Sequence, residues 1–236
     1  MCELLYHYTT FEAALKIIAS RQLRFGCFDK ANDIAECKRE YYTQKIPYAE
    51  IETEVKNYYY ISFTQDKKKN PGYALDNMWG YYADKWNGVC LGFDKQRIVK
   101  YFKSQCPKGR YGRVSYKELF SNALFSEIEK DETVDHFVER NIRSIFYTKA
   151  MPWSHEQEFR LVNKGTYGES LGYKDALMYV IMCMPKVEEY FKSPEYDIVS
   201  KIFPPKRIYE YGYSFGNCVV ENVYGESLSE IEGIDL

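Results

Sequence analysis

The segment Trp153–Val162, WSHEQEFRLV, carries two carboxylates one residue apart, Glu156 and Glu158, directly ahead of an alternating apolar run. This alternation predicts a β-strand whose first residues lie at an exposed sheet edge. Side chains two residues apart in a strand point the same way, so Glu156, Glu158 and Arg160 would share one face. An active-site carboxylate pair and a structural strand end neutralised by Arg160 both explain the pattern.

A histidine lies where a predicted strand meets a predicted helix. Leu4–Tyr8 is typical of a short strand, and Thr9–Glu12 matches a capping box that begins a helix near Phe11. His7 would therefore lie just ahead of a helix N-terminus, where backbone donors attract phosphate and other anions. A purely structural histidine remains an alternative.

A basic stretch follows the strand that is predicted for Tyr58–Thr64. Lys67, Lys68 and Lys69 lie in this loop, which is either simply solvated or in contact with a phosphate backbone. The chain also holds 24 tyrosines. Their rings could stack on bases or nicotinamide-like rings, or they could reflect strand preference and half-buried surfaces.

The composition is that of a balanced globular chain. A length of 236 residues suits one domain with a substantial core, and 32 Lys and Arg against 34 Asp and Glu exclude a basic nucleic-acid footprint over the whole surface. Seven scattered cysteines indicate neither a disulfide framework nor a zinc site, and no metal is expected. The chain lacks a long apolar run and a signal-peptide pattern, so we expect a cytoplasmic protein without a membrane partner.

The remaining pattern predicts a single α+β domain over residues 1–236. Val89–Phe93 is typical of a central strand buried on both faces, and Asp94 would cap the next helix, which extends to Ser104. Residues 221–236 hold five acidic side chains and no Lys or Arg, so we expect an exposed or partner-binding tail. Further helices are predicted for 36–56 (a pair broken near Pro47), 73–86 and 118–149, and further strands for 113–116 and 208–213.

Several sequence blocks resemble a known group of proteins. The blocks LYHYTTFEAALKIIASRQLRFG (5–26), NDIAE (32–36), ISFTQ (61–65), MWGYYADKWNGVCLGF (78–93) and HEQEFRLV (155–162) are similar to a poorly characterised bacterial family found among phage-defence genes. Its hallmarks here are YHYT, WxxYAxxxxGVCLGF and ExEFRLV. The likeness covers about residues 4–215, and the family is distantly similar to the ADP-ribosyltransferase superfamily.

This resemblance implies a fold and a co-substrate. The fold would be an ADP-ribosyltransferase-like split, mostly antiparallel sheet flanked by helices, with NAD in the cleft between the sheet halves. The NAD-binding residues that it implies are His7, Tyr8, Thr9, Ser62, and Tyr81 or Tyr82 as the aromatic that stacks on nicotinamide.

The resemblance also gives the carboxylates separate roles. Glu158 would be the key carboxylate, and Glu156 would orient the acceptor. Breaking the nicotinamide–ribose bond builds oxocarbenium-like charge, which a fixed carboxylate at the ribose 2′-hydroxyl stabilises without a metal. Arg160 would pair with a carboxylate or with the NAD pyrophosphate. On this basis Glu158→Gln should abolish transfer and leave the fold and NAD binding largely intact.

The function implied is an NAD-dependent mono-ADP-ribosyltransferase, a glycosyltransferase that acts as a phage-defence toxin on nucleic acid, with RNA as the favoured acceptor. The basic loop and the tyrosines could hold a single strand. An antitoxin or chaperone partner is expected by analogy. The alternatives are a protein-directed ADP-ribosyltransferase and a non-catalytic module that binds a nucleotide or nucleic acid.

Overall fold

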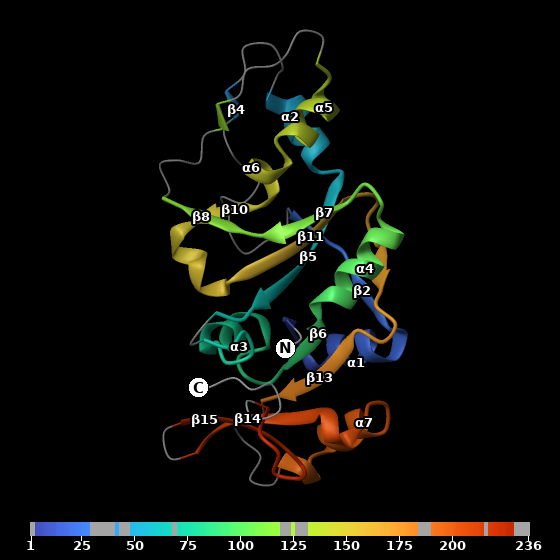
Figure 1. Cartoon of the computed structure of the whole chain (residues 1–236), viewed down its shortest axis with the longest axis vertical. Helices are drawn as coiled ribbons and strands as arrows, with labels where there is room; N and C mark the ends of the chain where they lie inside the picture. Colours follow the sequence, from blue (N-terminus) through green and yellow to red (C-terminus); the bar gives the residue numbers. More distant parts are fainter. Residues whose placement is uncertain are drawn as a thin grey trace. The chain divides into compact units, whose positions relative to one another are not determined.

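The computed structural model describes residues 3–28, 41–42, 48–67, 70–118, 124–125, 132–183, 190–214 and 217–228. Within them the chain is an α+β protein whose main sheet has nine strands and is mixed but mostly antiparallel (Figure 1). The hydrogen-bonded order is β15-β14-β13-β6-β1-β5-β11-β7, and β3 pairs with β5. The described residues form two compact units. The first takes them from 1–23, 63–101 and 172–236, and the second takes them from 24–62 and 102–171.

The first unit is organised around β6, which is buried along its whole length. Antiparallel β1 lies on one side of it, and antiparallel β13 lies on the other. Strand β14 then pairs in parallel with β13, and β15 closes an antiparallel hairpin with β14. The strand bounds are β1 (Leu4–Thr9), β6 (Val89–Asp94), β13 (Leu177–Met182), β14 (Ile208–Ser214) and β15 (Asn217–Asn222).

Local capping explains where the helices of this unit begin. The Thr10 hydroxyl accepts the amide of Ala13, 3.2 Å away, at the start of α1, and the Asp94 carboxylate accepts the amide of Arg97 at the start of α4. The helix bounds are α1 (Phe11–Ser20), α3 (Asp76–Tyr82), α4 (Lys95–Gln105, which continues into the second unit), α7 (Pro194–Ser200), and the short 3-10 turns η4 (Tyr190–Lys192) and η5 (Pro205–Arg207).

An aromatic core fills the first unit beside α3. Trp79 is fully buried, and its indole N–H donates to the Tyr73 carbonyl over 2.9 Å. Its ring lies 5.2 Å from that of Tyr8 and 5.0 Å from that of Tyr211. Gly88 allows close backbone packing here, because a Cβ at this position would lie 2.4 Å from the Thr9 carbonyl oxygen.

The second unit is organised around β11, which pairs antiparallel with β7 and lies next to β5 in the sheet. A parallel pair, β8 and β10, precedes it, with Tyr116 opposite Lys149. Its core packs aromatic rings such as Tyr58 and Phe146, whose centroids lie 4.7 Å apart. The bounds are β3 (Gly26–Cys27), β5 (Tyr58–Gln65, which continues into the first unit), β7 (Arg110–Arg113), β8 (Ser115–Lys117), β10 (Thr148–Ala150), β11 (Glu158–Lys164), α2 (Tyr48–Val55), α5 (Val134–Arg140), α6 (Ile142–Phe146) and η3 (Met151–Glu156).

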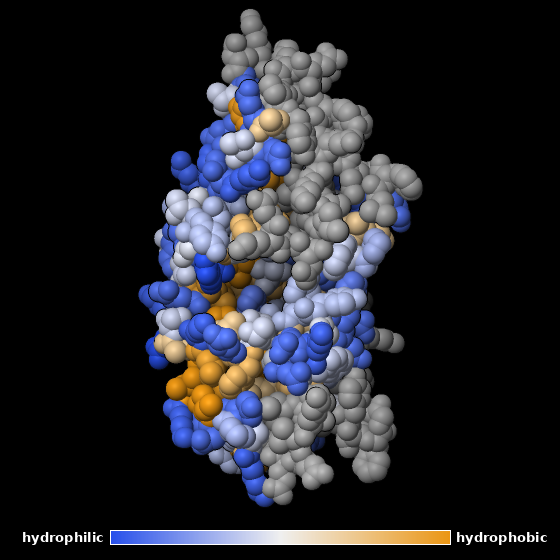
Figure 2. Space-filling model, turned by 180° about the vertical axis from the view of Figure 1, so that it is seen from behind, coloured by the Kyte–Doolittle hydropathy of each residue, from blue (hydrophilic) through white to orange (hydrophobic). Residues whose placement is uncertain are grey.

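Four short strands complete the described secondary structure. They are β2 (Gln22–Arg24), β4 (Tyr41–Tyr42), β9 (Leu124–Phe125) and β12 (Ser170–Gly172), and β4 pairs in parallel with β9. On the face drawn in Figure 2, hydrophilic side chains cover much of the coloured surface, and one orange hydrophobic patch lies at the lower left. Among the described residues, no helix is long and apolar enough to cross a membrane.

The sequence predicted the best-patterned elements correctly. The strands at 4–8, 58–64, 89–93 and 208–213 and the helices that begin at Phe11 and after Asp94 are confirmed, apart from shifts of a residue or two at their ends. The helix predicted for 73–86 is shorter, because Asp84, Lys85 and Trp86 have φ values of 47°, 52° and 73°. Such left-handed backbone cannot continue an α-helix.

Three other predictions need correction. In the region predicted as a helix pair, α2 confirms the helix after Pro47, but Tyr41–Tyr42 is a strand, and residues 36–40 and 43–47 lie outside the described part. The single strand at 113–116 is two strands, β7 and β8, and the helices of 118–149 are confined to α5 and α6 among the described residues. The acidic segment from 221 does not begin as a tail, because Asn222 and Leu228 are buried, and 229–236 lie outside the described residues.

Candidate functional site

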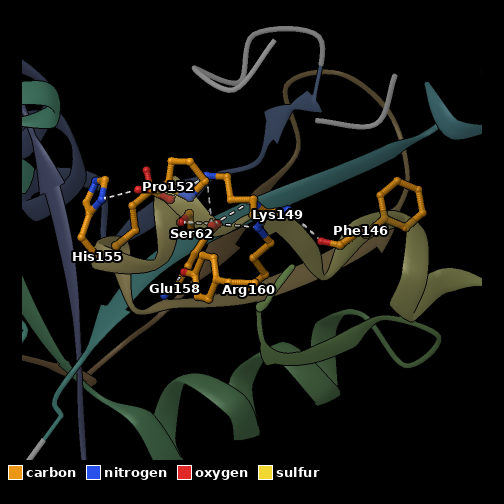
Figure 3. Close-up of polar contacts among 9 residues, drawn as sticks. Ser62, Phe146, Lys149, Pro152, His155, Glu158 and Arg160 are labelled. Carbon is orange, nitrogen blue, oxygen red and sulfur yellow. Dashed lines mark hydrogen bonds and ion pairs between the residues drawn. The ribbon is translucent and has the colours of Figure 1, made fainter. Parts of the chain in front are cut away.

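Glu158, the first residue of β11, lies at the centre of a buried polar cluster in the second unit (Figure 3). The residue is 3% exposed. Its Oε1 atom accepts a hydrogen bond from the Ser62 hydroxyl on β5 over 2.6 Å and another from Arg160 Nε. Its Oε2 atom accepts from Arg160 Nη2 over 2.8 Å. The carboxylate is thus held in a two-point pair with Arg160 and is fixed further by the serine.

A lysine joins the two carboxylates of this cluster. Lys149 on β10 places its Nζ atom 2.6 Å from Oε2 of Glu156 and 3.3 Å from Oε2 of Glu158. It is 5% exposed, and Glu156 is buried too. The ammonium also lies 5.2 Å from the centroid of the Trp153 ring. The cluster therefore contains two carboxylates and two cations, Lys149 and Arg160, in a nearly dry environment.

The backbone at Gln157 explains how both carboxylates reach Lys149. Glu156 ends the 3-10 turn η3 and does not lie in the strand, because Gln157 adopts a left-handed conformation with φ 49° before β11 starts. The prediction that Glu156 and Glu158 share one strand face is therefore wrong. The prediction of an exposed edge is also wrong, since Glu156, Glu158 and Arg160 are all buried. Arg160 does share a face with Glu158, as a strand requires.

The charges around Glu158 decide its protonation. Burial alone would raise the pKa of this carboxyl, but the charges of Arg160 and Lys149, with the hydrogen bonds from Arg160 and Ser62, lower it from 4.5 to about 2. Glu158 is therefore ionised at neutral pH. A fixed, ionised carboxylate can stabilise a positive charge that develops beside it.

Arg160 is held in place on all sides. Its Nη1 atom donates to the Phe146 carbonyl over 2.7 Å, and its guanidinium carbon lies 5.2 Å from the Tyr60 ring centroid and 5.7 Å from that of Phe28. The residue is 0% exposed. These contacts favour the alternative in which Arg160 pairs with a carboxylate, here Glu158, over contact with a pyrophosphate.

A tyrosine that the sequence analysis did not select also contacts Glu158. The backbone N–H of Glu158 donates to the Tyr116 hydroxyl over 2.9 Å, and burial raises the pKa of that phenol. Neither Tyr116 nor Lys149 was predicted as a site residue. The sequence signal for both is weak, because each lies in a three-residue strand, and Tyr116 is also distant in the chain from Glu158.

The predicted residues of β1 lie in the first unit. The His7 ring is partly buried and meets the Phe63 ring edge to face, with centroids 5.9 Å apart. The Tyr8 ring belongs to the aromatic core, and its hydroxyl donates to the Gly72 carbonyl over 2.7 Å. Thr9 is partly buried at the end of the strand. Of the predicted site residues, the structure thus brings Ser62, Glu156, Glu158 and Arg160 together in the second unit.

The predicted aromatic and basic residues are also in the first unit. Tyr81 is 64% exposed, whereas Tyr82 is partly buried, and their rings lie edge to face with centroids 6.5 Å apart. Lys67 is exposed and exchanges backbone hydrogen bonds with Asn70. Lys68 and Lys69 lie outside the described residues. The described part of the chain contains no group of three or more His, Cys, Asp or Glu that could hold a metal ion.

Comparison with known proteins gives a family match and no named relative. A family model for a protein of unknown function, DUF2971, matches residues 78–161, a segment that contains Lys149, Glu156, Glu158 and Arg160. No curated protein and no solved structure matches the chain. The chain is therefore similar to DUF2971 over this segment, and the match carries no activity with it.

Proposed function

We propose that this protein is an NAD-dependent mono-ADP-ribosyltransferase with an ADP-ribosyltransferase-like split sheet, in which Glu158 is the carboxylate that faces the reacting ribose. The observation that supports it is the 2.6 Å hydrogen bond from the Ser62 hydroxyl to Glu158 Oε1. It joins two of the blocks on which the sequence resemblance rests, the serine-containing strand and the Glu-x-Glu segment. The NAD co-substrate would supply the ADP-ribosyl group, with nicotinamide leaving.

The carboxylate has the properties that this chemistry needs. It is ionised at neutral pH, because Arg160 and Lys149 lower its pKa to about 2 against the effect of burial. It is also fixed in orientation by Ser62 and Arg160, so no reorganisation is needed when positive charge develops on a sugar. Arg160 has no exposed surface. We therefore assign it to holding Glu158 rather than to binding the pyrophosphate.

The acceptor that we favour is RNA, in keeping with a phage-defence toxin. The exposed Lys67 and Tyr81 offer a phosphate contact and a stacking ring in the first unit. His7, Thr9 and Tyr82, which are partly buried, remain the other candidates for contacts to NAD. An antitoxin or chaperone would be the natural partner of such an enzyme.

A second candidate function is a non-catalytic binding module. One observation favours it: both oxygens of Glu158 already accept hydrogen bonds from Ser62 and Arg160 within a site that is 3% exposed. A carboxylate that is saturated in this way can be purely structural. In the enzyme, a ribose hydroxyl would have to replace or share one of these hydrogen bonds from Ser62 and Arg160.

Labelled NAD distinguishes the two functions. The purified protein is incubated with NAD labelled in the adenine ring in three separate reactions, which contain a pool of RNA, of DNA or of protein. Released nicotinamide is measured in each reaction. The enzyme predicts nicotinamide release and label on RNA. A protein that binds NAD or nucleic acid but neither releases nicotinamide nor transfers label is the binding module. Label on protein alone would support the alternative of a protein-directed ADP-ribosyltransferase.

A further inference from the structure

Lys149 contacts both carboxylates of the Glu-x-Glu segment. Its Nζ atom lies 2.6 Å from Glu156 and 3.3 Å from Glu158, as Figure 3 shows for the Glu158 side of the cluster. All three residues are buried. Two carboxylates brought together in a dry environment repel each other and favour protonation unless a cation lies between them. The Lys149 ammonium therefore offsets the repulsion between the two carboxylates.

The fold places this lysine independently of the strand that carries Glu158. Lys149 lies on β10 opposite Tyr116 of β8, in a parallel pair. From this single ladder position the Lys149 ammonium reaches both carboxylates, and the Tyr116 hydroxyl accepts the N–H of Glu158 over 2.9 Å. The β8–β10 pair thus contacts the first residue of β11, Glu158, at both its side chain and its backbone N–H.

The two cations of the cluster differ in what they fix. Arg160 lies two residues from Glu158 on the same strand and makes a two-point contact with that carboxylate. Lys149 comes from another strand and links Glu158 to Glu156. Removing the Lys149 charge would leave the Arg160–Glu158 pair in place and remove the link between Glu158 and Glu156.

We propose that Lys149 is a positioning residue of the transferase: by contacting both, it holds the Glu156 and Glu158 carboxylates at a fixed separation, so that one carboxylate can serve the ribose and the other the acceptor. This inference rests on the proposed function. Lys149 acts through the two carboxylates and needs no contact of its own with either substrate.

Three variants test this role. Lys149→Met removes the charge and keeps the length of the side chain, whereas Lys149→Arg keeps the charge. The matched control is Lys164→Met on β11, because Lys164 also joins two carboxylates, Glu54 and Asp135, each at 2.7 Å, but is 41% exposed. Lys149→Met loses a buried contact to a reacting carboxylate, so it should lower kcat by about tenfold to a hundredfold, with little change in KM for NAD.

The pH dependence separates positioning from a structural role. Removing the Lys149 charge raises the pKa of Glu158, so the acid limb of the kcat profile for nicotinamide release should move to higher pH in Lys149→Met and return toward wild type in Lys149→Arg. The same shift should appear directly in ¹³C NMR titration of the assigned Glu158 side-chain carboxyl carbon. Lys164→Met should change neither the profile nor the titration.

A double variant covers the case in which Lys149→Met does not fold. Lys149→Met/Glu156→Gln removes both buried charges, so the unpaired carboxylate is absent and the protein should fold. Glu158 should still titrate at higher pH than in wild type. An unchanged Glu158 titration in either variant, or a wild-type pH profile in Lys149→Met, overturns the role of Lys149. A wild-type protein that releases no nicotinamide instead overturns the proposed function, and the titration then still decides whether Lys149 fixes the carboxylates.

Discussion

Replacing Glu158 with glutamine should destabilise the second unit strongly. The change leaves the buried Arg160 guanidinium without its anionic partner, and the amide NH2 that replaces one carboxylate oxygen is a donor that cannot accept the Arg160 N–H now directed at that oxygen. Breaking a buried ion pair from one side costs about 3–5 kcal/mol. The fall of the Glu158 pKa from 4.5 to about 2 gives a similar figure, about 3 kcal/mol at 1.36 kcal/mol per pH unit. The sequence-based expectation of a largely intact fold is thus replaced.

Urea unfolding at pH 7, followed by circular dichroism, measures this loss. The double variant Glu158→Gln/Arg160→Met should be more stable than Glu158→Gln alone, because neither buried charge is left unpaired. Glu12→Gln is the control, since Glu12 pairs with Lys16 on the exposed face of α1, and it should leave the midpoint unchanged. A Glu158→Gln protein within about 1 kcal/mol of wild type, or a double variant no more stable than the single one, would refute this account of the cluster.

Three further predictions concern stability. The pKa of Glu158 is lowered in the folded state, so its contribution to the free energy of unfolding is fully present above pH 4.5 and should be lost as the pH falls toward about 2. Urea midpoints at successive pH values should therefore fall more steeply in wild type than in Glu158→Gln/Arg160→Met. Ser62→Ala removes a hydrogen bond to a charged acceptor and should cost about 1.5–3 kcal/mol in the same urea assay, whereas a wild-type midpoint would contradict that contact. Gly88→Ala places a Cβ 2.4 Å from the Thr9 carbonyl oxygen and should cost about 1–3 kcal/mol by calorimetry, and an unchanged transition would contradict the close packing.

The fold was predictable wherever local signals agreed with burial. The apolar run at 89–93 is a central strand, and Asp94 caps a helix as expected, because these signals act over a few residues. The helix at Phe11 also begins as expected, but its cap is Thr10, one residue after the Thr9 at which the predicted capping box starts. The end of α3 was not predictable. It depends on left-handed backbone at three consecutive non-glycine residues, 84–86, which propensity does not indicate.

The candidate site was only partly predictable for a similar reason. The sequence resemblance selected Ser62 and Glu158, which do meet, but strand periodicity misplaced Glu156, because it assumed an unbroken strand across Gln157. Lys149 and Tyr116 could not be predicted, since their contacts depend on a parallel pairing of two three-residue strands. Such long-range pairing leaves no period in the sequence.

The rate of nicotinamide release from NAD tests the central claim most directly. Wild-type protein is compared with Glu158→Gln/Arg160→Met and with Lys164→Met at equal folded fraction, as judged by circular dichroism, in the presence of RNA. Our account predicts release and transfer of label to RNA by wild type and by Lys164→Met, and at least about a hundredfold lower release by the Glu158 variant. Equal rates in the Glu158 variant and the wild type, or no release by any of the three, would contradict it.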